Sequence, residues 1–193
     1  MKRDKTKKCK KKTSDVAKKD VMEKRYERNL IFTDKEQHEL AEKTVFIAGC
    51  GGLGGYCCEM LARAGAGKLI VCDGDVFDRS NLNRQLGATE QNLGKNKAEE
   101  IKKRINLINS QIQVCALPEF ISPYRTDMLT GADVVIDALD TAEGKLMLQS
   151  LCRETGTVMI HGGISGWQGQ VCTVMPGDDT LCNICLLYTS RCV

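Results

Sequence analysis

A glycine-rich turn directly after an apolar segment is the first feature of this sequence that suggests chemistry. Thr44–Ala48 is followed by Gly49-x-Gly51-x-x-Gly54, with Gly52 as a further glycine inside the turn. The pattern predicts a buried strand, a tight turn and a helix N-terminus, where backbone N–H groups and the helix dipole attract phosphate. The turn indicates a nucleotide without identifying it, and a glycine turn that binds nothing stays open.

Charged residues after later apolar segments narrow the choice of nucleotide. Asp73 follows the second apolar segment and stands where dinucleotide folds bind a ribose hydroxyl. Arg84 and Lys97 could neutralise a polyphosphate, and Asp140 follows a further strand and suits Mg²⁺ that bridges phosphates. These residues favour ATP with Mg²⁺. An NAD(P)-binding oxidoreductase remains an alternative, although no His or Tyr/Lys pair for hydride transfer is evident.

Each of these side chains also has a purely structural interpretation. Arg84 and Lys97 could be ordinary surface charges, and Asp140 could be the N-cap of the helix that follows it. His161 is interpreted as a packed or hydrogen-bonded histidine rather than a catalyst, and Cys172 as a strand residue rather than a nucleophile. Whether each side chain faces the nucleotide site decides between its functional and its structural interpretation.

Periodicity and turn residues predict alternating strands and helices. Strands are expected over 44–48, 68–72, 111–117, 133–137, 158–161 and 169–175, and helices over 20–29, 33–42, 53–64, 94–109, 121–130 and 142–155. Thr33 and Glu36 form a capping box, and Pro123 is expected at the first position of its helix. The order predicts an α/β, Rossmann-like, doubly wound fold with a mostly parallel sheet and helices on both faces.

Charge and cysteine content describe the two parts of the chain. The 193 residues carry a net charge of +3, but residues 1–28 hold 13 Lys and Arg against 5 Asp and Glu. Residues 1–19 are expected to form a basic disordered arm; no interleaved aromatics support nucleic-acid binding. The 11 cysteines, without an export signal or a membrane-length apolar segment, indicate reduced thiols and a cytoplasmic protein.

Taken in order, the motifs resemble those of the ThiF/MoeB/HesA family of ubiquitin-activating E1-like adenylating enzymes, over about 25–186. The matches are R-Y-x-R at 25–28, G-x-G-G-L-G at 49–54, D-x-D at 73–75, S-N-L-x-R-Q at 80–85, G-x-x-K at 94–97, D-x-x-D at 137–140, G-Q-V near 170 and C-x-x-C at 182–185. The resemblance implies an N-terminal helical segment over 20–43, a ThiF-type adenylation domain over 44–186 and an atypical tail over 187–193.

The family activity that this resemblance implies is ATP-dependent adenylation of the C-terminal glycine carboxylate of a ubiquitin-like sulfur-carrier protein, of the thiamine or molybdopterin type, with release of pyrophosphate. It implies a homodimer in which Arg28 reaches the neighbouring subunit's phosphates. Arg28, Arg84, Lys97 and Asp140 would be catalytic, with Mg²⁺ on Asp140. The implied nucleotide contacts are Gly49, Gly51, Gly52, Gly54, Asp73, Asp75, Ser80, Asn81, Arg84, Gln85, Lys97, Asp140 and Thr141.

Two departures from the bacterial pattern bear on which carrier is used, and the C-terminal end departs further. Thr141 stands where the bacterial pattern has Asn, and Lys145 stands where Arg is usual. Cys182 and Cys185 resemble half of a four-thiolate zinc site, so zinc is expected in the complete protein. Because 187–193 no longer follows the pattern, the chain is expected to be C-terminally truncated. A non-catalytic partner that binds a carrier without activating it is the remaining alternative.

Overall fold

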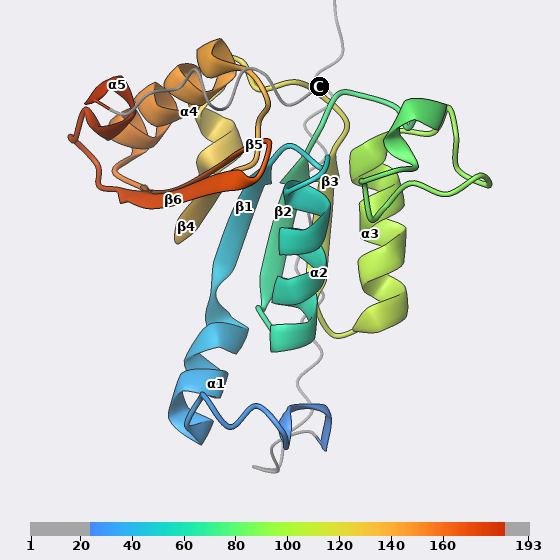
Figure 1. Ribbon diagram of the computed structural model, residues 1–193. Helices are drawn as coiled ribbons and strands as arrows, with labels where there is room; N and C mark the ends of the chain where they lie inside the picture. Colours follow the sequence, from blue (N-terminus) through green and yellow to red (C-terminus); the bar gives the residue numbers. More distant parts are fainter. Residues whose placement is uncertain (1–23, 184–193) are drawn as a thin grey trace, which may run out of the picture.

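A computed structural model describes residues 24–183 of the chain. Its centre is a six-stranded sheet in the order β3-β2-β1-β4-β5-β6. The first five strands are parallel, and β6 pairs antiparallel with β5. Figure 1 shows α2 and α3 in front of β1–β3 and α4 behind the other end of the sheet. The predicted α/β doubly wound fold is confirmed.

The elements agree closely with the predicted order. The strands are β1 (Thr44–Ala48), β2 (Lys68–Cys72), β3 (Gln113–Leu117), β4 (Val134–Asp137), β5 (Val158–Ser165) and β6 (Gln168–Val174). The α-helices are α1 (Asp34–Glu42), α2 (Gly54–Ala64), α3 (Lys97–Ile108), α4 (Ala142–Thr155) and α5 (Thr180–Asn183). Short 3₁₀ helices are η1 (Lys24–Tyr26), η2 (Arg79–Asn81) and η3 (Thr126–Leu129). The predicted capping box at the start of α1 is present.

Alternate residues of the central strands face two separate cores. Val45 and Ile47 of β1 pack with apolar residues of α2 and α3, whereas Phe46 and Ala48 pack with those of α4 and η3. Successive side chains on a strand point to opposite faces, so a strand with helices on both sides is apolar at every position. This is why β1 and β2 read as unbroken apolar segments. The sheet thereby holds the carboxyl ends of its strands in one rigid row.

The segment expected to form a helix over 121–130 does not do so. Only η3 forms there, and Pro123 lies in a turn closed by the Arg125 N–H, which donates to the Ser122 carbonyl at 3.1 Å. Serine at the first position and proline at the second suit such a turn as well as they suit a helix start. The prediction was wrong because local signals do not distinguish the two.

The ends of the described chain also differ from expectation. Within 20–29, residues 20–23 lie outside the described part, and the remainder forms only η1. Its Tyr26 hydroxyl accepts a hydrogen bond from Asn109 at 2.9 Å, so a tertiary contact fixes this segment. At the other end, β5 continues past its predicted end through two glycines, because Gly162 and Gly163 pair with Val171 and Gln170 of β6. Predictions for 1–19 and 187–193 lie outside the described residues.

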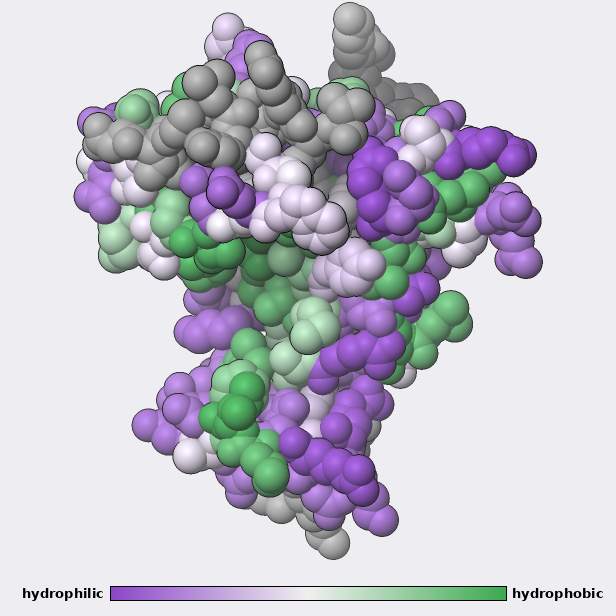
Figure 2. Space-filling view, viewed as in Figure 1, coloured by the Kyte–Doolittle hydropathy of each residue, from purple (hydrophilic) through white to green (hydrophobic). Residues whose placement is uncertain are grey.

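Two regions of the surface are hydrophobic. Figure 2 shows apolar surface over the strands beside α2, where the sheet has no covering helix in this view, and a second patch before α1. In the second patch Leu30 and Ile31 are 90% and 84% exposed. Among residues 24–183, no helix is both long and apolar enough to cross a membrane.

Candidate functional site

A cavity of about 810 Å³ lies at the carboxyl ends of the parallel strands. It spans the point where the chain crosses from one side of β1 to the other, which is where open α/β sheets bind ligands. The segments after β1, β2, β3 and β4 and the C-terminal half of β5 contribute to its wall. The predicted nucleotide contacts that line it are Gly49, Gly51, Gly52, Asp73, Asp75, Arg84, Gln85, Lys97, Asp140 and Thr141.

The glycine turn forms the floor of this cavity. Gly49 has φ +90°, and a Cβ there would lie 2.7 Å from the Ala138 carbonyl oxygen. Gly54 does not line the cavity; a Cβ there would lie 1.8 Å from the Gly49 carbonyl oxygen, so its role is the close packing of helix on turn. No side chain caps the N-terminus of α2. The Gly55 N–H donates to the Gly51 carbonyl at 3.1 Å, but no side chain caps the other first N–H groups of α2, which an anion site requires.

Asp73 joins the glycine turn to the loop after β2. Its carboxylate accepts the Cys50 N–H at 2.7 Å and the Asp75 N–H at 2.8 Å. Burial raises the pKa of Asp73 above its usual value, and these two N–H bonds and the charge of Lys97 offset part of that rise. A carboxylate fixed in this way beside the turn can accept a hydrogen bond from a ribose hydroxyl.

Two cations meet the cavity from the β2 side. Lys97 is nearly buried, and its Nζ lies 3.1 Å from Asp75 Oδ2. Arg84 is exposed, and its guanidinium donates to the Ser80 carbonyl and to Asn83 Oδ1, each at 3.0 Å. Both residues line the cavity, so the structure does not favour the alternative that they are ordinary surface charges.

Ser80 and Asn81 do not line the cavity. Asn81 is buried, and its Oδ1 accepts the Asp78 N–H at 2.9 Å in a capping box around η2. Its backbone carbonyl accepts the Arg84 N–H at 3.2 Å. The expectation that Asn81 touches phosphate does not fit this geometry, because its side chain holds the loop that carries Arg84.

Asp140 is exposed on the opposite wall of the cavity, in the loop between β4 and α4. The N-cap of α4 is Thr141, whose Oγ1 accepts the Gly144 N–H at 3.2 Å. The alternative that Asp140 is the N-cap is therefore wrong. Within residues 24–183 the Asp140 carboxylate has no hydrogen-bond or ion-pair partner. It is available to a cation bound in the cavity.

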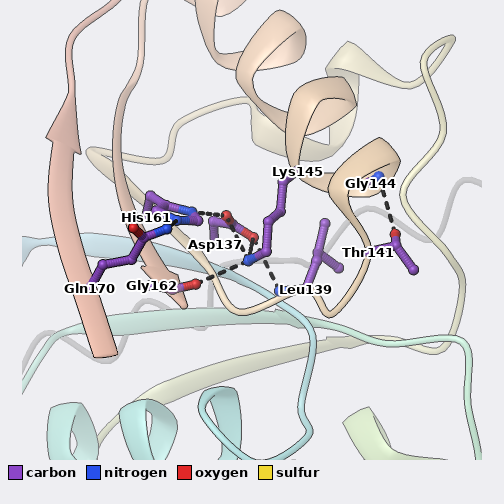
Figure 3. A network of polar contacts seen from close by, with 8 residues as sticks. All are labelled: Asp137, Leu139, Thr141, Gly144, Lys145, His161, Gly162 and Gln170. Atoms are coloured by element: carbon purple, nitrogen blue, oxygen red, sulfur yellow. Dashed lines mark hydrogen bonds and ion pairs between the residues drawn. The ribbon is translucent and has the colours of Figure 1, made fainter. Parts of the chain in front are cut away.

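A buried polar network behind this loop escaped the sequence analysis as a unit (Figure 3). Asp137 Oδ2 lies 2.6 Å from His161 Nδ1 and 3.2 Å from Lys145 Nζ. His161 Nε2 in turn lies 3.1 Å from Gln170 Nε2. The prediction that His161 is a hydrogen-bonded histidine is confirmed. Asp137 and His161 interrupt apolar strands and pair in register across β4 and β5, which was the available signal.

Cys172 lies opposite His161 in the β5–β6 pair, which would place it beside a His–Asp pair as in a nucleophilic cysteine site. Burial and the nearby charge of Asp137 raise the pKa of the Cys172 thiol, and the side chain packs against the core next to α4. His161 uses its two ring nitrogens on Asp137 and Gln170. The geometry supports the interpretation of Cys172 as a strand residue.

Three further predicted site residues lie away from the cavity. Arg28 is exposed in the segment before α1, at the opposite end of the sheet (Figure 1). Cys182 is exposed in α5, and Cys185 lies outside the described residues. Residues 24–183 contain no group of three or more side chains able to hold a metal ion. One described thiol does not make a zinc site, and we derive no chemistry from zinc.

Comparisons with known proteins agree with this geometry. The family model described as "ThiF family" matches residues 26–191. The SAMP-activating enzyme E1 of Haloferax volcanii is 33% identical over 166 residues, 84% of this chain and 61% of that protein. The sulfur carrier protein ThiS adenylyltransferase of Bacillus subtilis is 33% identical over 169 residues, 84% of this chain and 50% of that protein.

A solved structure extends the comparison to a nucleotide complex. E. coli tRNA N6-threonylcarbamoyladenosine dehydratase, TcdA, in complex with ATP, superposes with a TM-score of 0.68 and 32% identity, over 72% of this chain and 58% of that chain. The chain thus spans about half to three fifths of the length of these relatives. The family model covers most of the sequence, and the chain belongs to the ThiF family.

Proposed function

We propose that this chain is the adenylating part of an enzyme that transfers AMP from ATP to the C-terminal glycine carboxylate of a ubiquitin-like sulfur carrier, with release of pyrophosphate. The observation that carries the proposal is the cavity. It brings the glycine turn, Asp73, Arg84, Lys97 and Asp140 together from five separate places in the sequence. The names of the Haloferax volcanii and Bacillus subtilis relatives support the class of reaction and of substrate.

The proposed reaction places most of the work on position and charge. A carrier carboxylate oxygen attacks the α-phosphorus, a new P–O bond forms, and the bond to the pyrophosphate oxygen breaks. The N–H groups at the start of α2 would hold phosphate, and Asp73 would hold the ribose. Arg84 and Lys97 would balance the negative charge of the leaving pyrophosphate. None of these steps requires a covalent bond to the protein.

Mg²⁺ suits the wall opposite these cations. Proteins hold Mg²⁺ through one or two carboxylates together with substrate phosphates, so a full protein cage is not needed. The unpartnered, exposed carboxylate of Asp140 fits that requirement. A bound Mg²⁺ would neutralise phosphate charge, and Asp140 would fix its place against the loop after β4. Arg28 would act only across a homodimer, since its own chain places it at the far end of the sheet.

A substrate carried on tRNA is a second candidate, because a solved relative at 32% identity is named for a tRNA modification. This candidate would contradict the expectation that the protein has no nucleic-acid partner. That expectation stays a prediction. Adenylation of a carboxylate is compatible with either carrier at the cavity described. Family membership disfavours the NAD(P)-binding oxidoreductase. A non-catalytic carrier-binding protein predicts carrier binding without any AMP adduct.

ATP–pyrophosphate exchange tests the proposal. The full chain is incubated with ATP, Mg²⁺, labelled pyrophosphate and purified sulfur carriers of the thiamine or molybdopterin type, and in parallel with tRNA. Exchange that depends on a carrier with an intact C-terminal glycine supports the proposal. Exchange that depends on tRNA alone favours the second candidate. Carrier binding without exchange, also in a version extended to the length of the relatives, contradicts adenylation.

A further inference from the structure

Lys145 lines the cavity, but its ammonium group is buried and paired, and it has no direct part in the proposed chemistry. The structure assigns it a positioning role: through Asp137, it holds the β4–α4 loop so that Asp140 faces the cavity. This role rests on the proposed function only in supposing that the loop presents Asp140 to a metal ion. The contacts of Lys145 themselves involve no ligand (Figure 3).

Lys145 is fully committed to groups around the loop. Its Nζ lies 3.3 Å and 3.2 Å from the two oxygens of Asp137 and 3.0 Å from the Gly162 carbonyl oxygen. The two side chains of the ion pair are 1% and 0% exposed. An ammonium group in such a place is costly unless it is both paired and hydrogen-bonded. The pair therefore fixes the first turns of α4 against the ends of β4 and β5.

Asp137 passes this constraint to the loop. The oxygen of Asp137 that Lys145 contacts at 3.3 Å also accepts the Leu139 N–H at 3.1 Å. On the far side of Asp140, the hydroxyl of Thr141 caps α4. Asp140 thus stands between one residue tied to the Asp137 carboxylate and one tied to the helix. Loss of the Lys145 charge would leave Asp137 buried without a counter-ion and release the first of these ties.

His161 does not replace Lys145 as the counter-ion. The two contacts of its ring suit a neutral imidazole that donates from Nδ1 to Asp137 and accepts at Nε2 from the Gln170 amide. That arrangement leaves one carboxylate and one ammonium group in the network. We therefore expect the position of the loop to depend on the positive charge of Lys145.

Hydrogen–deuterium exchange without nucleotide or metal tests the inference directly. Lys145→Met is compared with Lys145→Arg, which keeps the charge, and with Gln149→Leu. Gln149 lies one turn further along the same helix, but its amide bonds to the Asp178 carbonyl and the Leu181 N–H in the C-terminal part of the described chain. We expect Lys145→Met to speed exchange of the 138–141 backbone at least tenfold, with Lys145→Arg near wild type.

The control removes a general loss of stability as the explanation. Gln149→Leu should lower the unfolding temperature without faster exchange at 138–141. Equal effects of Lys145→Met and Gln149→Leu on this segment would overturn the positioning role. If Lys145→Met does not fold, Lys145→Gln takes its place, because its amide keeps an N–H donor for Asp137; wild-type exchange in that folded variant would also overturn the role.

A double-mutant cycle of ATP binding, with and without Mg²⁺, tests whether the loop position affects the proposed Mg²⁺ site. ATP affinity is measured by calorimetry with and without Mg²⁺ in wild type, Asp140→Asn, Lys145→Met and the double variant. Both single variants should reduce the gain in affinity that Mg²⁺ provides, and the double variant should lose no more than Asp140→Asn. Additive losses overturn the positioning role. Absence of any gain in wild type overturns the proposed Mg²⁺ site instead, and the exchange result then decides the role of Lys145 alone.

Discussion

The two walls of the cavity carry charge in different ways. On the β4 side, Asp137 and Lys145 are fully buried and bonded to backbone and to His161. On the β2 side, Lys97 is nearly buried but pairs with an Asp75 side chain that is 56% exposed, and the Arg84 guanidinium is exposed. Buried pairs are costly to break, whereas exposed pairs contribute little to stability. We infer that buried contacts fix the β4 wall, whereas more of the charge on the β2 wall is accessible to a ligand.

The strongest way to break this comparison is to remove one carboxylate from each wall. Asp137→Asn leaves the Lys145 ammonium buried without a counter-ion, so we expect a loss of about 3–5 kcal/mol in the free energy of unfolding. Asp75→Asn should cost less, about 1 kcal/mol, because Asp75 is 56% exposed and the nearby Asp73 charge still acts on the nearly buried Lys97. Urea unfolding followed by far-UV circular dichroism measures both. Equal losses would show that the two walls do not differ as described.

A pair of glycine variants sharpens the same contrast at the floor of the cavity. Gly54→Ala places a Cβ against the Gly49 carbonyl oxygen and should destabilise the fold by about 3 kcal/mol, the upper end for overpacking. Nothing lies within 4 Å of a Cβ at Gly52, which lines the cavity. Gly52→Ala should leave the unfolding free energy nearly unchanged and weaken ATP binding. Thermal unfolding and calorimetry with ATP check the two variants; a stable Gly54→Ala protein would refute the packing role.

The exposed cation Arg84 tests what the β2 wall contributes to catalysis. Hydrogen bonds to charged groups contribute about 1.5–3 kcal/mol, so Arg84→Ala should lower kcat/KM for ATP–pyrophosphate exchange by about tenfold to a hundredfold. The unfolding free energy should hardly change, because Arg84 is exposed. Added salt should weaken wild type more than the variant. A variant with wild-type kcat/KM would remove Arg84 from the site.

The smallest effect is expected at the ion pairs of Glu59, which link α2 to α3 away from the cavity. Glu59 on α2 accepts from Arg104 on α3 at 2.6 Å and from Arg63 at 2.7 Å. Burial raises the pKa of Glu59, but these hydrogen bonds and charges outweigh it and leave the pKa below the usual 4.5. A lowered folded pKa stabilises the protein above the unfolded pKa, and that contribution disappears as pH falls through the folded value.

Glu59→Gln should therefore cost at most about 1 kcal/mol at pH 7, with less difference from wild type at pH 4. Urea titrations at both pH values measure it. Glu154→Gln, at an exposed position of α4 on the other face of the sheet, is the control for an ordinary surface carboxylate. A difference that grows towards acidic pH would show that the sign assigned to Glu59 is wrong.

The sequence predicted the parts of the fold that depend on local pattern. The strand, turn and helix at the glycine motif appear as expected, and α4 begins and ends at the predicted residues, between the Thr141 cap and the left-handed Gly156. The segment at Pro123 was missed, because serine followed by proline suits a turn as well as a helix start. The cavity residues were found through their motif order, whereas Ser80 and Asn81 share that order but support the loop from behind.

The buried network was missed for a different reason. Asp137, Lys145 and His161 lie on three elements, and sequence spacing does not show that their side chains meet. Each has an ordinary interpretation alone: a strand end, a substituted arginine and a packed histidine. Only the register of β4 on β5 and the position of α4 bring them together.

The central claim is that a triphosphate, held by both walls, occupies this cavity. Calorimetry with the wild-type chain and with Arg84→Ala, against ATP with Mg²⁺ and against NAD⁺ and NADP⁺, tests it most directly. We predict that ATP binds the wild-type chain, that Arg84→Ala weakens this binding, and that neither dinucleotide binds comparably. Tight NAD⁺ or NADP⁺ binding that survives Arg84→Ala, with no binding of ATP, would contradict the account.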